Sequence, residues 1–130
     1  MRVELMMPAN NEEKVKNDLL RILVAAKELG VQLDGDTFSR AWFSDNTRVC
    51  LASDGGKDVG IGIMAFGRRY YDADQSASVL VAEGPARNTI LEYLLDMARV
   101  LGARFMYYEA RVDDTIKGEQ TLQHVIEVQS

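Results

Sequence analysis

Two stretches of the chain carry apolar residues at the spacing of three and four that is typical of an amphipathic helix. The first comprises Val15, Leu19, Ile22, Ala26 and Leu29, and the second comprises Ile90, Leu91, Leu94, Leu95, Ala98 and Leu101. Gly30 and Gly102 follow these runs, as glycine often does at helix C-termini. Asn10, three residues before Glu13, predicts the start of the first helix, and Pro85 suits the first turn of the second.

A third, shorter helix is predicted between these two. Asp36 is placed to cap it, and Phe38 and Trp42 lie four residues apart, on one helix face.

Five apolar or alternating runs predict strands. They are Arg2–Met7, Arg48–Ser53, Val59–Phe66, Ala77–Ala82 and Arg104–Val112. Ala77–Ala82 is apolar on both faces, as a central strand would be. A turn over Asp54–Lys57 predicts a hairpin, and 68–74 is a polar hairpin tip. Gly60 and Gly62, inside the third run, indicate a bulge or a close approach of another segment.

The C-terminal part gives a weaker pattern. Asp113 and Asp114 can cap another short helix, and 121–128 half alternates, which leaves a last strand open.

The predicted order is therefore β-α-α-β-β-β-α-β. Residues 77–112 form a β-α-β crossover, whose two strands are parallel and whose connection is right-handed. The earlier strands are joined by hairpins, so the sheet is mixed, antiparallel with one parallel pair. At 130 residues this predicts a single α/β (α+β) domain covering 1–130.

Composition narrows the function classes. The formal net charge of −5 argues against a nucleic-acid binder, which needs a basic face. Cys50, the one cysteine, sits in a predicted strand and is expected to be a buried structural thiol in a reducing compartment. No apolar run reaches the length of a membrane span, so we expect a cytoplasmic protein that binds no membrane.

This order of elements resembles the GNAT (Gcn5-related N-acetyltransferase) family, over nearly the whole chain. The resemblance implies an acetyl-coenzyme A cleft where the fourth strand and the central helix diverge from their neighbours. The stretch "SVLVAEGPARNTI", residues 78–90, is the corresponding strand, turn and helix start.

The family's pyrophosphate loop has the pattern Arg/Gln-x-x-Gly-x-Gly/Ala, and a leucine pair follows it. Setting that pair on Leu94–Leu95 places the glycine positions on Thr89 and Leu91, and no glycine lies between Gly84 and Gly102. The chain therefore matches the family in topology and departs from it in this loop.

The resemblance implies a set of site residues. The backbone of Val79, Leu80 and Val81 would bind the pantetheine arm, and Arg87, Asn88 and Thr89 the phosphates of acetyl-CoA.

Two side chains would take catalytic roles by the same resemblance. Glu83 would be the general base and Tyr108 the general acid. The alternatives are a solvated strand-end glutamate and a tyrosine that packs in the core. Trp42 and Phe43 would lie on the acceptor side, with a structural role equally open. His124 has no partner at ligand spacing, so no metal site is predicted.

Two functions follow. The first is acetyl-CoA-dependent N-acetylation of a small-molecule or protein amine. The second is a non-catalytic GNAT-fold module, of the kind expected in a phage, that has lost acetyl-CoA and binds a protein partner or forms a homo-oligomer. Whether the space before Arg87, Asn88 and Thr89 is open or filled separates the two.

Overall fold

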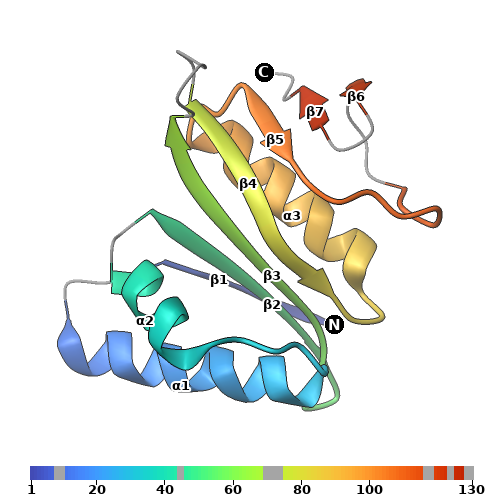
Figure 1. Cartoon of the computed structure of the whole chain (residues 1–130). Helices are drawn as coiled ribbons and strands as arrows, with labels where there is room; N and C mark the ends of the chain where they lie inside the picture. Colours follow the sequence, from blue (N-terminus) through green and yellow to red (C-terminus); the bar gives the residue numbers. More distant parts are fainter. Residues whose placement is uncertain (8–10, 44–45, 69–74, 116–118, 123–124, 128–130) are drawn as a thin grey trace.

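A twisted sheet runs through the molecule, with helices on both of its faces (Figure 1). This computed structural model describes the chain except for residues 8–10, 44–45, 69–74, 116–118, 123–124 and 128–130. The elements are β1 (Arg2–Met6), α1 (Glu12–Glu28), α2 (Gly35–Phe43), β2 (Thr47–Asp54), β3 (Lys57–Arg68), β4 (Gln75–Glu83), α3 (Arg87–Val100), β5 (Phe105–Tyr107), β6 (Glu119–Leu122) and β7 (Val125–Glu127). Within the described residues the strand order is β1-β2-β3-β4-β5-β7-β6.

The pairing confirms the predicted mixed sheet. β1 to β4 are antiparallel neighbours, and β4 pairs with β5 in parallel. The turn between β2 and β3 is the predicted hairpin, with Gly55 and Gly56 at φ of 58° and 80°. In place of one last strand over 121–128, β6 and β7 form an antiparallel pair, and β7 adds to β5. Within the described residues the sheet therefore continues past β5, the strand with which the predicted order ended.

Two predicted helix starts are displaced. The Asn11 side chain accepts a hydrogen bond from Lys14 N at 3.1 Å and caps α1, while Asn10, the residue predicted for this start, lies outside the described residues. At α2, Asp34 Oδ1 accepts from the backbone N–H groups of Asp36 and Thr37, so Asp34 does the work predicted for Asp36. The apolar period locates the start of each helix within two residues. The capping residue is the one whose side-chain oxygen accepts a hydrogen bond from a backbone N–H group of the first turn.

The prediction of a strand over Arg104–Val112 was wrong beyond Tyr107. β5 has three residues, and Tyr108 turns into the core, where it is 3% exposed. Residues 109–115 then run without a helix or strand, and Asp114 accepts a hydrogen bond from the backbone N–H of Arg111 instead of capping a helix. Alternation in the sequence cannot distinguish a strand from an extended segment that binds through side chains.

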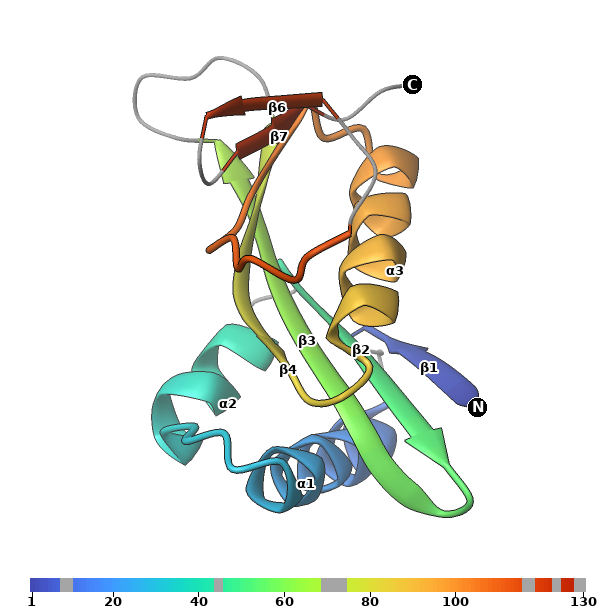
Figure 2. The same cartoon turned by 90° about the vertical axis from the view of Figure 1, so that its right-hand side faces the viewer.

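The core has one layer on each face of the sheet (Figure 2). α1 and α2 cover one face, with Trp42 and Ile22 among the buried side chains, and α3 covers the other. Gly60 and Gly62 let α3 approach β3, because a Cβ atom there would lie 2.8 Å and 2.5 Å from side-chain atoms of Ile90. The predicted close approach is therefore that of α3.

Most of the predicted apolar face of α3 is buried, but Leu101 is 37% exposed at the helix C-cap. In the part of the chain that is described, no helix combines the length and the apolar character that crossing a membrane requires.

Candidate functional site

β4 and β5 separate at one end of their contact. Residues 76–78 pair in parallel with residues 105–107, after which β4 continues to Glu83 and the chain beyond β5 leaves the sheet. The divergence leaves a wedge-shaped gap beside the second half of β4. We call this gap the strand split. It lies where the sequence predicted a cofactor cleft.

A β-bulge interrupts β4 beside the strand split. Val81 pairs with Ile63 and Val79 with Met64, so Leu80 is an extra residue between them. The Leu80 side chain is 61% exposed, which corrects the expectation that β4 is apolar and buried on both faces. A bulge takes a residue out of regular pairing and re-aims its neighbours. The three residues predicted to bind the pantetheine arm are the ones that form this bulge.

Two pockets meet at the bulge, because Leu80 and Val81 line both. The split pocket encloses about 70 Å³ and is also lined by Glu83, Arg87 and Tyr108. The second, which we call the α2 pocket, encloses about 180 Å³, and Asp34 and Thr37 at the start of α2 lie in its wall. The bulge therefore places one stretch of β4 between two pockets.

The turn from β4 to α3 depends on Gly84. Its φ is 106°, and a Cβ atom would lie 2.5 Å from the carbonyl oxygen of Val59. Ala86 N donates to the same oxygen at 2.9 Å, which fixes the turn on β3. The N-cap residue Ala86 gives no side-chain hydrogen bond to the helix. The first turn of α3 is thus held firmly in place without a capping side chain.

Arg87 lies at the centre of the strand split. Its guanidinium donates to both carboxylate oxygens of Asp114, at 2.8 Å and 3.1 Å, to Glu109 O at 2.7 Å and to Ala82 O. The side chains of Arg87 and Asp114 are only 13% and 5% exposed. Hydrogen bonds from Arg87 hold the pKa of the Asp114 carboxyl below its usual value. Arg87 therefore bridges β4 to the segment that follows β5.

Asn88 adds a second connection to that segment. Its Nδ2 donates to Asp113 O at 3.2 Å, and its Oδ1 accepts from Thr115 N at 3.1 Å. Residues 109–115, which we call the closing segment, thus lie across the start of α3 (Figure 2). The space before Arg87 and Asn88 is filled by the chain itself. Thr89, the third predicted phosphate-binding residue, is half-buried and does not line the split pocket.

Glu83 is joined to the closing segment by Arg111. Arg111 Nη1 donates to Glu83 Oε2 at 3.1 Å, and Nη2 donates to Oε1. These hydrogen bonds lower the pKa of the Glu83 carboxyl. A general base that works near neutral pH is served by a raised carboxyl pKa, so the shift has the opposite direction. The catalytic role of Glu83 stays a prediction.

Several other sequence-based assignments can be located. Tyr108 packs in the core, as one alternative expected, and it also lines the split pocket. Its role as general acid stays a prediction. Trp42 is fully buried, with its ring 6.2 Å from that of Phe38, which supports the structural alternative. Cys50 is buried as expected, and burial raises the pKa of its thiol to about 12.

Other assignments lie outside what can be described. His124, residues 69–74 of the polar tip and the Phe43 side chain are outside the described part of the structure. Among the residues that are described, no three His, Cys, Asp or Glu side chains gather as metal ligands would.

Sequence reasoning missed the part that Arg111 and Asp114 play. Their contacts join positions 27 or 28 residues apart, which no local pattern reveals. The unusual density of charge in residues 109–114 was the one signal available.

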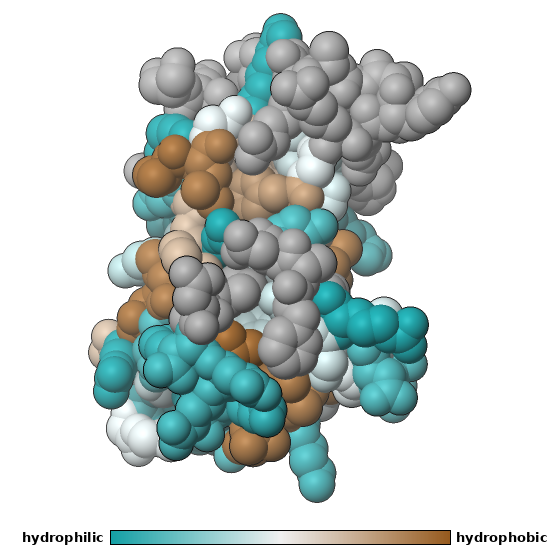
Figure 3. All heavy atoms as spheres, turned by 90° about the vertical axis from the view of Figure 1, so that its left-hand side faces the viewer, coloured by the Kyte–Doolittle hydropathy of each residue, from teal (hydrophilic) through white to brown (hydrophobic). Residues whose placement is uncertain are grey.

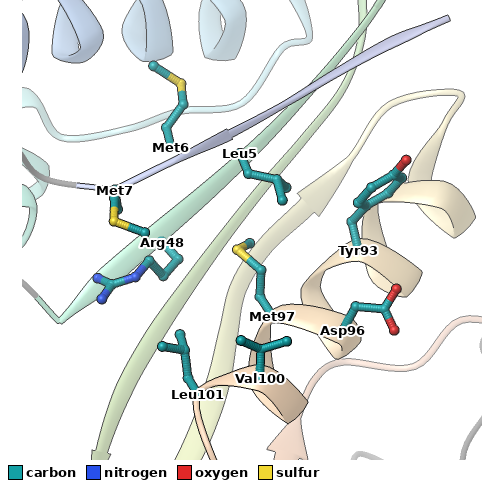
Figure 4. Close-up of a pocket in the computed structure, with 9 residues that line it drawn as sticks. All are labelled: Leu5, Met6, Met7, Arg48, Tyr93, Asp96, Met97, Val100 and Leu101. Carbon is teal, nitrogen blue, oxygen red and sulfur yellow. The ribbon is translucent and has the colours of Figure 1, made fainter.

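A larger apolar groove lies away from this site, between β1 and the C-terminal half of α3. It encloses about 400 Å³, and Leu5, Met7, Met97, Val100 and Leu101 line it. Figure 4 shows Leu5 on β1 and Met97 on α3 facing the same space, while Met6 points to the other side of the strand. Figure 3, which views the side where β1 ends, shows apolar atoms in separate patches, toward the left edge and in the lower part of that face.

Comparisons with known proteins agree on the fold. No known family model and no curated protein matches the sequence. Among solved structures, an aminoglycoside acetyltransferase from an uncultured soil metagenomic sample, in complex with sisomicin, superposes with a TM-score of 0.58 and 15% identity, covering 93% of this chain and 91% of that one.

Two further structures extend the likeness. A GNAT family acetyltransferase of Staphylococcus aureus has a TM-score of 0.56 and 13% identity, over 93% and 96% of the two chains. A ribosomal-protein-alanine N-acetyltransferase of Brucella melitensis has a TM-score of 0.56 and 11% identity, over 86% and 81%. At these identities the likeness establishes the fold and leaves activity open.

Proposed function

The chain has the GNAT acetyltransferase fold, and from that premise we propose that it is an N-acetyltransferase that takes its acetyl group from acetyl-CoA and gives it to an amine. Acetyl-CoA supplies the acetyl group as a thioester. The observation that carries the proposal is the bulge at Leu80, where the split pocket and the α2 pocket share one stretch of β4. In an acetyl transfer the donor and the acceptor must meet, and the two pockets that share the bulge would hold one of them each.

The residues around the two pockets would divide the work. The backbone of Val79, Leu80 and Val81 would hold the pantetheine arm and polarise the carbonyl that is attacked. The α2 pocket would receive the amine, and the Asp34 carboxylate in its wall favours a cationic group. Glu83 would accept the amine proton, and Tyr108 would donate one to the departing thiolate.

The phosphate-binding end does not accommodate acetyl-CoA as the closing segment stands. The split pocket of about 70 Å³ is well below the roughly 300–1,000 Å³ of ordinary small-molecule sites. Arg87 is engaged with Asp114, and the acceptor at Ala82 O is already used. N-acetylation therefore requires the closing segment to leave the strand split.

The same closure favours a second candidate, a non-catalytic GNAT-fold module that binds a protein partner and no acetyl-CoA. On that alternative the closing segment is a permanent part of the fold, and the groove between β1 and α3 is a surface for contact. It predicts a defined oligomer or a stable complex.

Titration of the protein with acetyl-CoA, followed by calorimetry and by the midpoint of thermal unfolding, separates the candidates. A ligand selective for the folded state must raise that midpoint. Release of free CoA thiol in the presence of an aminoglycoside, or of a peptide with a free N-terminal alanine, then measures transfer. No heat and no thermal shift at millimolar acetyl-CoA, from the wild type and equally from a variant whose closing segment is loosened, would leave the binding module as the function.

Glu83→Gln tests the assigned base. Loss of a positioned general base costs roughly 10²–10⁴-fold in rate, so we expect a fall in kcat of that order. The control is Glu92→Gln, which changes an exposed carboxylate on α3 and should leave kcat unchanged. Equal activity of the two variants would remove Glu83 from the mechanism.

A further inference from the structure

The closing segment is attached to the site by polar contacts rather than by a core of its own. Of its two apolar residues, Ala110 packs against the core and Val112 is fully exposed. Hydrogen bonds and ion pairs to Glu83, Arg87 and Asn88 join the segment to β4 and to the start of α3. Segments with few buried apolar contacts open locally at a lower free energy than the fold as a whole.

The fold around the strand split does not depend on this segment for its packing. α3 is buried against the sheet through Ile90, Leu91 and Leu94, all fully buried. The turn before α3 is held by β3 through the carbonyl of Val59. Removing the closing segment from the split would thus leave β4, the bulge and α3 in place.

The Asp114 carboxylate is an anion bound to the side chain of Arg87, the first residue of α3. This carboxylate accepts two hydrogen bonds from Arg87 and one from Arg111 N at 2.7 Å, as a bound phosphate oxygen would. An arginine fork pairs equally well with a carboxylate and with a phosphate. If Asp114 withdrew, Arg87 would be left as an arginine beside the N-terminus of a helix, where anions are favoured.

We propose that the closing segment is an autoinhibitory latch, in which Asp114 competes with a phosphate group of acetyl-CoA for Arg87. This inference rests on the proposed acetyltransferase function. Closure and cofactor binding exclude each other, so the apparent dissociation constant for acetyl-CoA equals the intrinsic constant divided by the fraction of open molecules. Weakening the latch raises the affinity for acetyl-CoA, although it removes contacts from the protein.

Asp114→Asn is the direct test, since it keeps the shape of the side chain and removes its charge. Asp113→Asn is the matched control, because the Asp113 side chain is exposed and only its carbonyl oxygen contacts Asn88. Arg111→Gln loosens the same segment from its other anchor, at Glu83, and keeps the test valid if the Asp114 variant folds poorly.

Two measurements are made on each protein. Calorimetry gives the dissociation constant for acetyl-CoA, and amide hydrogen exchange reports on residues 109–115 without any ligand. We expect Asp114→Asn and Arg111→Gln each to bind acetyl-CoA about ten-fold tighter than the wild type, or more, with faster exchange in the closing segment. Asp113→Asn should match the wild type in both readouts.

Two results would overturn the latch, and they differ in what else they remove. Equal affinities of wild type, Asp114→Asn and Arg111→Gln would leave acetyl-CoA binding intact and show that the segment does not control it. Faster exchange in the closing segment without acetyl-CoA binding by any variant would remove the acetyltransferase function as well.

Discussion

At the residue scale, one ion pair apart from the candidate site ties α1 to the β2–β3 hairpin. Both terminal guanidinium nitrogens of Arg21, Nη1 and Nη2, donate to Asp58, at 3.1 Å and 2.6 Å, and Asp58 is 7% exposed. The hydrogen bonds from Arg21 lower the pKa of Asp58 below its usual 3.8, and those from Arg111 and Arg87 do the same for Glu83 and Asp114. These carboxylates link stability to pH.

The free energy of unfolding should therefore be nearly constant from pH 7 to pH 5 and fall at acid pH. A carboxyl with a lowered folded-state pKa stabilises the protein above its unfolded pKa, and this stabilisation is lost as pH falls through the folded value. Glu28 opposes the trend, because its hydrogen bond to Asp58 raises its pKa, so the fall should begin below about pH 4.

Asp58→Asn isolates this contribution. We expect a loss of roughly 1.5–3 kcal/mol at pH 7, the range for hydrogen bonds to charged groups, and a shallower acid limb. Urea unfolding at a series of pH values measures both. Asp54→Asn, an exposed hairpin carboxylate, serves as control and should follow the wild type. An acid limb as steep in Asp58→Asn as in the wild type would contradict the assignment.

At the scale of elements, the apolar period predicted the helical faces and the strands better than it predicted where each element begins and ends. The helical faces of α1 and α3 and the strands before α3 were confirmed, because burial on a sheet imposes a period that the sequence must carry. The caps at Asn11 and Asp34 and the end of β5 at Tyr107 were missed. The two caps are decided by side-chain hydrogen bonds to backbone N–H groups, which the apolar period does not encode.

The packing of α3 on β3 gives a test at this scale. Gly62→Ala would place a Cβ atom 2.5 Å from Ile90 and 2.9 Å from Leu94, so the helix must shift. Overpacking of this kind costs about 1–3 kcal/mol. Gly67→Ala, in the same strand with nothing within 4 Å, is the control. Chemical denaturation should show a loss for the first variant alone, and equal midpoints would mean that α3 sits further from the sheet.

At the scale of the whole molecule, one sheet supports both core layers, so the two should unfold together. Trp42, on α2, belongs to the core layer between the sheet and the helices α1 and α2, and Cys50 belongs to the layer under α3. We expect the fluorescence of Trp42 and the labelling of the Cys50 thiol to give the same urea midpoint, as in a two-state single domain. Two separate midpoints would divide the chain into two cooperative units.

The candidate site could be predicted from the sequence only in part, and the reason lies at this same scale. The resemblance pointed to Val79, Leu80, Val81 and Arg87, which are close together along the chain, and their binding roles stay predictions. It could not locate Arg111 and Asp114, whose contacts exist only once β5 has paired with β4. The absence of glycine from the predicted loop indicated a changed site, and in the structure the closing segment lies across the start of α3.

The contact between Arg87 and Asp114 joins residues 27 positions apart in one chain, so the carboxylate is a tethered ligand. Tethering gives a group an effective concentration near Arg87, on the order of millimolar for a short flexible connection. Diluting the protein does not reduce that value. An incoming anion must displace Asp114 through its own concentration or affinity. The sequence of this chain therefore sets the anion concentration above which Arg87 is released from Asp114.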